Sequence, residues 1–488
     1  MALRAAYALN EDDFRKGWHN GTAMSHALAD RYRCPEEFVH CELDGPLSTE
    51  SGYFRFGHDA ICYGRTSSGY RTPDADALRY DARRDLDTTG STLVLPFNPD
   101  KIIDNLRLER YAWQAKPSEW TWRQRFLRDA YYLLRPYVGA GIRGYLKRVY
   151  ANGWRSVAFP RWPVDTTVEQ FIEALLLASM KAKGVDRMPF IWFWPRGATG
   201  SVIMTHDIED LAGYDFCRDL MDIDEAHGIR ASFQLVPEGR YKTTDDLLQE
   251  IRNRGLEVNI QDLNHDGYLF ADRQEFLHRA VKINRYGKIY GSKGFRAAVL
   301  YRNVDWYDAL DFSYDMSVPN VAHLDPQKGG CCTVMPYFVK DILEIPVTTT
   351  QDYMLFHLLR EYSLDLWKTQ ADIILRKHGI VSFLVHPDYV IEERARKIYR
   401  ELLGWLRELA AREHLWLALP GEVDAWWRAR SSMRLVNRGG SWRIEGAGAD
   451  HAVIAFANDA GDHIEYEIGS KMQGLDGHDS TSAPGMVK

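Results

Sequence analysis

The 488-residue sequence contains no long uninterrupted run of apolar residues. A transmembrane helix needs about 20 consecutive, predominantly apolar residues, so we expect no membrane span. The first residues, MALRAAYALNEDDFRKGW, also lack the continuous apolar segment of a secretory signal. These two absences favour a cytoplasmic location.

Cysteine is scarce and positive charge is not in excess. The six cysteines form no CxxC pair and no dense spacing, which excludes a disulfide framework and fits a reducing compartment. The formal net charge of -7 provides no broad basic field for a nucleic-acid backbone, so we expect no nucleic-acid partner. Nothing in the sequence indicates the oligomeric state.

The remaining composition is that of an ordinary globular protein, with 45% hydrophobic and 26% charged residues. A chain of this length is expected to form two or three domains. Tryptophan (15) and tyrosine (26) are plentiful. Such aromatic rings serve hydrophobic cores, and they also stack on sugar rings, so they only weakly indicate a carbohydrate ligand.

Short β-rich runs alternate with helical patterns between residues 201 and 423. A helix is predicted at 244–255, with Thr244 as its cap and Gly255 at its end, and another at 392–408. The alternation predicts a mainly parallel sheet. The predicted strands are 201–207, 231–237, 257–263, 294–300, 312–318, 342–348 and 381–387, with 416–420 as one more candidate.

Polar side chains recur at the carboxyl ends of these runs, namely Asp207, Asp262, His265, Thr348 and His386. In a (β/α) barrel those ends converge on one face, where active sites are built. In an open sheet they would spread along an edge, with only the switch point forming a crevice. The pattern therefore favours an α/β fold of the (β/α)-barrel kind.

Changes in pattern divide the chain into four predicted parts. Residues 1–155 are expected to form an N-terminal α+β domain and residues 156–428 the barrel. Residues 429–472 have short strands separated by Gly-rich turns, which predicts a β-sandwich-like module, and 473–488 form a Gly/Ser/Asp-rich, disordered tail.

Two tryptophans, Trp192 and Trp194, precede the first predicted barrel strand. Trp194 is a candidate for stacking on a sugar ring, but core packing beside that strand is the favoured alternative for both.

The segment His206-Asp207-Ile208-Glu209-Asp210 places four ionisable groups directly after an apolar run. Packed carboxylates raise one another's pKa and can divide the work between metal ligand and general base. The alternative is an acidic helix start, where carboxylates favour the helix dipole.

Further chemically capable residues follow other predicted strands. His265 lies between Asp262 and Asp266, and His386 ends an apolar strand before Pro387. The ordinary pKa of imidazole suits proton donation to a leaving group. Arg296 and Asp315 occupy equivalent positions on other units, where each alone would more often be half of an ion pair.

This ordered set resembles the polysaccharide deacetylase (NodB-like, carbohydrate esterase family 4) superfamily, over roughly residues 200–390. The resemblance implies a distorted barrel with Asp207 as the catalytic base and Glu209 as a metal ligand. It also implies Arg296 beside the base and His386, in Val-His-Pro, as the general acid. The paired-histidine motif is similar to Gln261-Asp-Leu-Asn-His265, which implies Gln261 and His265 as metal ligands and a divalent metal, expected to be zinc.

The chain departs from the family pattern at Gln261, where a metal-binding histidine is expected. A neutral amide oxygen is a poorer zinc ligand than imidazole. Asp262, Asp266 or Asp210 are alternatives that could complete the site. Some members of the superfamily hydrolyse cyclic amides without a metal, so the departure does not exclude catalysis.

Three functions follow as expectations. The first is metal-assisted hydrolysis of a C–N amide bond, expected to be N-deacetylation of an amino sugar, with Asp315, Trp194 and Tyr389 contacting substrate. The second is metal-independent C–N hydrolysis by Asp207 and His386. The third is a degenerate barrel that binds carbohydrate without turnover. In each case the partner is a carbohydrate or another small molecule.

Overall fold

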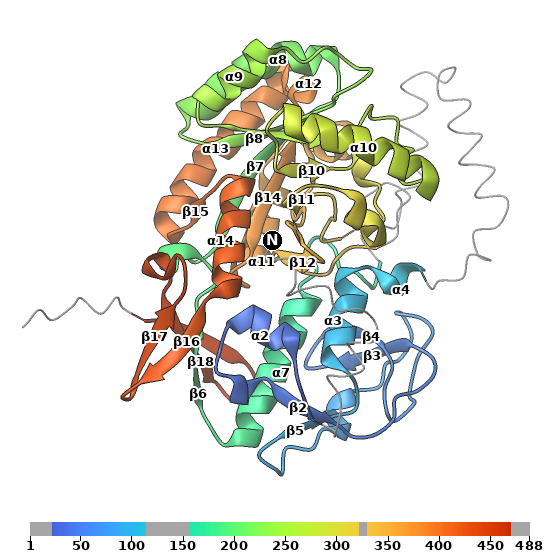
Figure 1. Cartoon of the computed structure of the whole chain (residues 1–488), viewed down its shortest axis with the longest axis vertical. Coiled ribbons are helices and arrows are strands. Elements are labelled where there is room, and N and C mark those ends of the chain that lie inside the picture. The colour runs from blue at the N-terminus through green and yellow to red at the C-terminus, as the bar shows by residue number, and fades with distance from the viewer. Residues whose placement is uncertain (1–21, 114–156, 322–328, 470–488) are drawn as a thin grey trace, which may run out of the picture.

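The computed structural model describes residues 22–113, 157–321 and 329–469 (Figure 1). Part of the predicted N-terminal domain and the predicted tail at 473–488 lie outside these ranges. Within them, no helix combines the length and the apolar character needed to cross a membrane.

A nine-stranded sheet forms the centre of the molecule. Its order is β12-β13-β11-β10-β9-β8-β7-β14, and β15 also pairs with β7. All pairs are parallel except that of β12 with β13. The strands are β7 Ser201–Ile208, β8 Ala231–Leu235, β9 Glu257–Gln261, β10 Gly294–Arg296, β11 Tyr314–Asp315, β12 Tyr337–Val339, β13 Ile342–Glu344, β14 Ile380–Val385 and β15 Trp416–Leu417.

The sheet curls into a half-barrel whose backbone ladder does not close between β13 and β14. Threonine side chains bridge this seam instead. The hydroxyl of Thr348 donates to the carbonyl of Ile380 and that of Thr349 to the carbonyl of Ser382, each at 2.8 Å. The expected α/β barrel is thus confirmed as a curled α/β sheet, with side chains completing one side.

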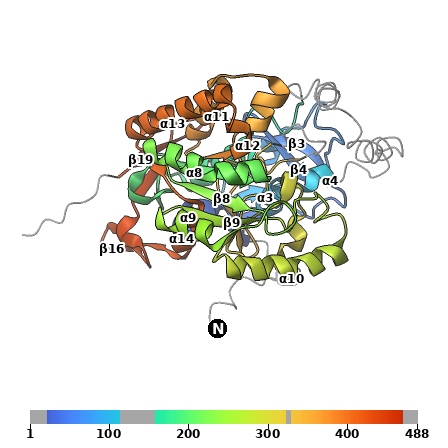
Figure 2. The same cartoon turned by 90° about the horizontal axis from the view of Figure 1, so that it is seen from above.

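Helices cover the outer face of the half-barrel, as Figure 2 shows for α8, α9, α10 and α13. In α9, the Thr244 hydroxyl accepts from the Leu247 amide and Gly255 has a φ of 70°, as the sequence predicts. These helices and the outward strand residues share one apolar core. The helices of this part are α8 Leu211–Ala226, α9 Asp245–Asn253, α10 Arg273–Ile289, α11 Asp365–Leu375, α12 Pro387–Val390, α13 Glu393–Glu413 and α14 Pro420–Ser432, with a π-helical turn, η7, at Met354–Leu359.

A second layer lies below the half-barrel in Figure 1 and comes from both ends of the described chain. One of its sheets has the order β1-β2-β5, and β3 and β4 form a hairpin. Its elements are β1 Thr22–Met24, α2 His26–Tyr32, β2 His40–Leu43, β3 Gly52–Phe56, β4 Ala60–Gly64, β5 Leu93–Leu95, α3 Pro99–Arg107, α4 Arg110–Trp113, α7 Thr167–Lys183 and β6 Arg187–Ile191.

The C-terminal strands do not form the predicted separate β-sandwich. β18 (Ile454–Asp459) pairs with β19 (Ile464–Ile468) on one side and with β6 on the other. A sheet therefore crosses the predicted boundary at residue 429, and only β16 (Arg434–Arg438) and β17 (Ser441–Glu445) form a hairpin of their own. The predicted independent module is wrong, because two of its strands, β18 and β19, extend a sheet that begins with β6, more than 250 residues earlier.

The core of this second layer closes the amino-terminal end of the half-barrel. It includes the inward residues Ile203, Met316 and Leu343 together with Trp192 and Trp194. Trp194 has no exposed surface, and its indole N–H donates to the carbonyl of His378 at 2.6 Å. The expectation that Trp194 stacks on substrate is therefore wrong, and the core-packing alternative describes its place.

Candidate active site

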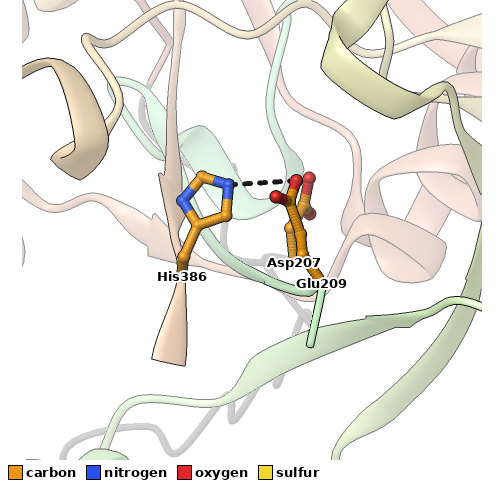
Figure 3. A group of neighbouring side chains, drawn as sticks. All are labelled: Asp207, Glu209 and His386. Carbon is orange, nitrogen blue, oxygen red and sulfur yellow. Dashed lines mark ion pairs between the residues drawn. The ribbon is translucent and has the colours of Figure 1, made fainter. Parts of the chain in front are cut away.

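The carboxyl ends of the central strands bring most of the predicted site residues together. Side chains alternate between the two faces of a strand, and on β7 the inward row runs from apolar Ile203 through Thr205 to Asp207. Asp207 and Glu209 leave β7 toward His386, which follows β14 (Figure 3). This end of the half-barrel is the candidate active site.

Asp207 is held by two donors. Its Oδ1 accepts from Nη1 of Arg296 at 2.6 Å and its Oδ2 from the amide nitrogen of Gln261 at 3.1 Å. Arg296 is itself fixed, since Nη1 also donates to the Thr205 hydroxyl at 2.9 Å and Nε to the carbonyl of Met316 at 3.0 Å. A fully buried guanidinium thus faces one edge of the Asp207 carboxylate and fixes its orientation.

Glu209 is the meeting point of three donors. Its Oε1 lies 2.7 Å from Nε2 of His265, 3.2 Å from the Gln261 amide nitrogen and 3.5 Å from Nε2 of His386. Burial acts to raise the pKa of Glu209, but the charges of the two imidazoles outweigh it and hold this pKa well below its usual range. Glu209 is therefore a carboxylate at neutral pH.

His386 is paired with Asp352, a residue that the sequence patterns did not reveal. Nδ1 of His386 lies 2.7 Å from Oδ1 of Asp352, and the His386 backbone N–H donates to Oδ2 at 2.8 Å. Burial acts to lower the pKa of His386, but Asp352 and Glu209 outweigh it and raise this pKa well above its usual value. Asp352 follows Thr348, one of the polar residues at a predicted strand end, and that position was the available signal.

His265 reaches the site from a strained loop after β9. Both Asp262 and His265 have positive φ, 52° and 56°, which non-glycine residues rarely adopt outside sites that require it. Nη2 of Arg240 donates to the His265 carbonyl at 2.9 Å. The loop is thereby fixed with the imidazole turned toward Glu209.

The acidic residues considered as additional metal ligands serve local structure. Asp210 caps α8 by accepting from the Gly213 amide, which is the helix-start role foreseen for part of this cluster. Asp266 pairs with Arg279, and Asp262 accepts from the Leu263 amide. The acidic cluster thus combines an inward pair, Asp207 and Glu209, with a helix cap.

The donor atoms of this site bear on whether it can hold a metal ion. One ligand atom each from Asp207, Glu209 and His386 lies within 4.8 Å of the others, so spacing alone would permit an ion. Both ring nitrogens of His386 face carboxylate oxygens, however, and a protonated imidazole offers no lone pair. Zinc needs deprotonated ligands.

Gln261 does not act as a ligand in this arrangement either. Its amide nitrogen faces Asp207 and Glu209, whereas its oxygen Oε1 is buried and has no hydrogen-bond partner among the described residues. Here Gln261 supplies two N–H donors where a ligand would supply a lone pair. Of the predicted zinc set of Glu209, His265 and Gln261, Gln261 therefore offers zinc no lone pair in this arrangement.

Asp315 is a predicted substrate contact that the structure places elsewhere. On the neighbouring strand Asp315 is in register with Phe295, so it shares the outward row of Phe295 and not the inward row of Arg296. It is buried and accepts from the hydroxyls of Tyr307 and Ser317 at 2.9 and 2.7 Å. The expectation that Asp315 contacts substrate is wrong for this reason.

His206 also faces outward, directly behind the site. Its Nε2 lies 2.9 Å from Oδ2 of Asp224, whose Oδ1 accepts from the Tyr399 hydroxyl at 2.5 Å. Nδ1 of His206 lies 3.2 Å from the carbonyl of Val385. His206 and Val385 directly precede Asp207 and His386 in the chain. The His206 imidazole therefore links the ends of β7 and β14, beside these two site residues.

The predicted substrate contact Tyr389 lies on the half-buried rim beside His386. The two ring centroids are 5.1 Å apart, and the Tyr389 ring also contacts Tyr353 and His357 at 5.5 and 4.6 Å. Next to it, burial raises the pKa of Asp388 to about 7. The rim thus offers an aromatic ring and a carboxyl group close to the acid.

Comparisons with known proteins were made on sequence and on structure. No family model and no curated protein matches the sequence. A solved structure described as a polysaccharide deacetylase from Mycobacterium smegmatis is similar, with a TM-score of 0.39, 16% identity, and coverage of 51% of this chain and 97% of that chain. Puue allantoinase has a TM-score of 0.38 and 13% identity, over 48% of this chain and 92% of its own. The peptidoglycan deacetylase PdaC from Bacillus subtilis has a TM-score of 0.32 and 12% identity, over 49% and 96%.

Proposed function

We propose that this chain hydrolyses a C–N amide bond, with an N-acylated amino sugar as its substrate. The observation that carries the proposal is geometric: the Asp207 carboxylate accepts from Arg296 close to His386, whose pKa Asp352 helps to raise well above its usual value. Asp207 and His386 have ligand atoms within 4.8 Å of each other, so a base and an acid face one small volume. Amide hydrolysis needs such a pair.

In the first step Asp207 accepts a proton from a water molecule while the water oxygen bonds to the amide carbon. Glu209 lies beside Asp207 and is ionised, so it can orient that water by accepting its second hydrogen bond. The carbonyl oxygen then becomes an oxyanion. Nη2 of Arg296 is buried without a hydrogen-bond partner among the described residues, and it is our candidate donor to that oxyanion.

In the second step the C–N bond breaks and its electron pair goes to nitrogen. Nε2 of His386 gives its proton to that nitrogen, and Asp352 stabilises the imidazole throughout. The products are a carboxylic acid and an amine. Transfer of the proton from Asp207 back to His386 restores the starting state.

This route needs no metal, in keeping with the donor set of the site. Three basic groups, Arg296, His265 and His386, face the acidic groups Asp207, Glu209 and Asp352. Gln261 then fills the space between two of those carboxylates with N–H donors. Metal-dependent hydrolysis is the second candidate, and the spacing of Asp207, Glu209 and His386 is the observation that favours it.

The amino-sugar substrate is proposed from the rim. Tyr389 offers a half-buried ring beside the acid, on the side where the leaving amine must depart. Aromatic rings stack on the apolar faces of sugar rings. A sugar carrying the amine would lie on Tyr389 with its nitrogen toward His386.

The test is release of free amine from N-acetylglucosamine, its oligomers and a simple N-alkyl acetamide. Protein purified without chelator is compared with the same protein after EDTA treatment, and bound metal is measured by mass spectrometry. The proposal expects turnover of an acetylated sugar that EDTA leaves unchanged. Loss of turnover that zinc restores would establish the metal-dependent candidate, and sugar binding without any turnover would establish the carbohydrate-binding alternative.

A further inference from the structure

The second layer binds the half-barrel at Arg302, shortly after Arg296 in the chain. Glu109, between α3 and α4, forms a bidentate ion pair with Arg302, with Nε donating to Oε2 at 2.8 Å and Nη2 to Oε1. The two side chains are only 5% and 4% exposed and lie 193 residues apart in sequence. A planar bidentate pair fixes orientation as well as distance.

The segment between Arg296 and Arg302 is a strained turn. Val299 and Leu300 have φ values of 57° and 54°, and a β-branched residue such as valine is a genuine outlier in that region. Such backbone persists only where its surroundings hold it. Nη1 of Arg302 donates to the Leu300 carbonyl at 2.8 Å, so the ion pair and the turn form one unit.

Glu109 is in turn anchored on its own side. Its Oε1 accepts from the Gly330 amide at 2.6 Å, and the Tyr111 hydroxyl donates to the Gly330 carbonyl at 2.8 Å. The turn therefore depends on the second layer and not only on the barrel.

The turn directs Leu300 to the inside of the half-barrel. Leu300, Val347 and Leu384 form a small apolar cluster separate from the two large cores. Leu384 lies two residues before His386 in the same inward row and is in register with Thr205, which accepts from Arg296. This cluster is thus an apolar wall next to the acid and the arginine, where the acyl part of an amide would lie.

We propose that Glu109 is a positioning residue, because through Arg302 it holds Leu300 against Val347 and Leu384. In this way the second layer, which carries Glu109, sets how large an acyl group the site accepts. This rests on the proposed amide hydrolysis. A buried ion pair adds little net stability over apolar packing, so its main contribution here is geometric. Without it, the turn relaxes from its strained backbone and Leu300 leaves the wall.

The test compares Glu109→Gln with a matched control, Glu173→Gln. Glu173 on α7 also forms an ion pair across the two layers, with Lys377 after α11, but away from the turn. Hydrogen exchange of peptides covering 297–303 is measured in the full chain, together with kinetics on N-acetyl, N-propionyl and N-butyryl glucosamine.

In Glu109→Gln we expect amide exchange in the turn to rise about tenfold, with β7 and β14 unchanged. We expect the preference for acetyl over butyryl in kcat/KM to fall about fivefold, mainly through KM, with the pH profile unmoved. Glu173→Gln should change neither quantity. Unchanged exchange in the turn, or an equal change in the control, would overturn the proposal.

Two further outcomes are separable. If Glu109→Gln does not fold, Arg302→Lys keeps the charge but loses the bidentate geometry, and the same two readouts decide. If the wild-type chain turns over none of the three sugars, no N-acetylglucosamine oligomer and no N-alkyl acetamide, the proposed function fails, and the exchange data alone still decide whether Glu109 holds the turn.

Discussion

Two pairs of carboxyl groups lie at the carboxyl ends of strands in the same sheet, and they differ in what surrounds them. Asp207 and Glu209 face inward, toward Arg296 and two imidazoles. Asp315 and Glu344 are register neighbours on β11 and β13 and face outward, where Asp315 meets hydroxyl groups. The residue types are alike, but the strand faces are opposite.

This difference in partners shifts the pKa of one member of each pair in opposite directions. The imidazoles of His265 and His386 hold the pKa of Glu209 well below its usual range. Burial, reinforced by the charge of Asp315, raises the pKa of Glu344 well above its usual range. A pair that faces a possible proton donor can take part in base catalysis, whereas a pair closed in by hydroxyl groups is a structural contact.

The strongest test of this comparison is Asp207→Asn. The amide keeps the shape and a hydrogen bond to Arg296 but cannot accept a proton from water. We expect kcat to fall by about a thousandfold or more, with little change in KM. Circular dichroism and thermal unfolding check that the variant is folded, and full activity in a folded variant would remove Asp207 from the role of base.

The next effect is expected from Asp352→Asn. Since Asp352 helps raise the pKa of His386, its loss lowers that pKa. The acid must be protonated to act, so the alkaline limb of the pH–rate profile should move to lower pH, and kcat should fall about a hundredfold. A lower rate with an unmoved alkaline limb would show that His386 is not the titrating acid.

Asp315→Asn is the matched control for Asp207→Asn, because it makes the same change in the outward pair. The amide loses one of the acceptor oxygens that bind Tyr307 and Ser317, which should cost about 1–3 kcal/mol of unfolding free energy. Activity should stay within about twofold of wild type. Urea denaturation and steady-state kinetics measure the two quantities, and a large loss of activity at unchanged stability would return Asp315 to the site.

The sequence predicted the strands in their places but not their ends. The run at 294–300 becomes β10, which ends at Arg296. Val299 and Leu300 turn away from the sheet, because Arg302 donates to the Leu300 carbonyl and holds the turn. Local signals such as the Thr244 cap were sufficient to predict where α9 begins, since they act within one helix turn. The pairing of β18 with β6 was not predictable in this way, because its partner lies far away in sequence.

The same distinction applies to the site. The order of polar strand ends identified Asp207, Glu209, Arg296 and His386, and the structure brings them together. Which face of the sheet a residue occupies depends on the register of its strand with the neighbouring strand. The register of β10 with β11 places Asp315 on the outward face. Asp352 was missed because it lies at the start of the short helical turn that leads into η7, which no pattern in the sequence predicted.

The smallest expected effect concerns Asp388 on the rim. It tests whether burial raises the pKa of Asp388 as it raises the pKa of Glu344. Burial raises the pKa of Asp388 from 3.8 to about 7. Between these values the folded chain binds a proton at Asp388 that the unfolded chain has released, so this group makes stability fall as pH rises through that window.

Asp388→Asn removes the titration. Its melting temperature should therefore decline less than that of the wild type between about pH 4 and pH 7. Asp219→Asn, at an exposed position of α8, is the control and should follow the wild type. Parallel curves for the wild type and Asp388→Asn would mean that the Asp388 carboxyl is solvated, and burial alone would then not separate the inward acids from their surroundings.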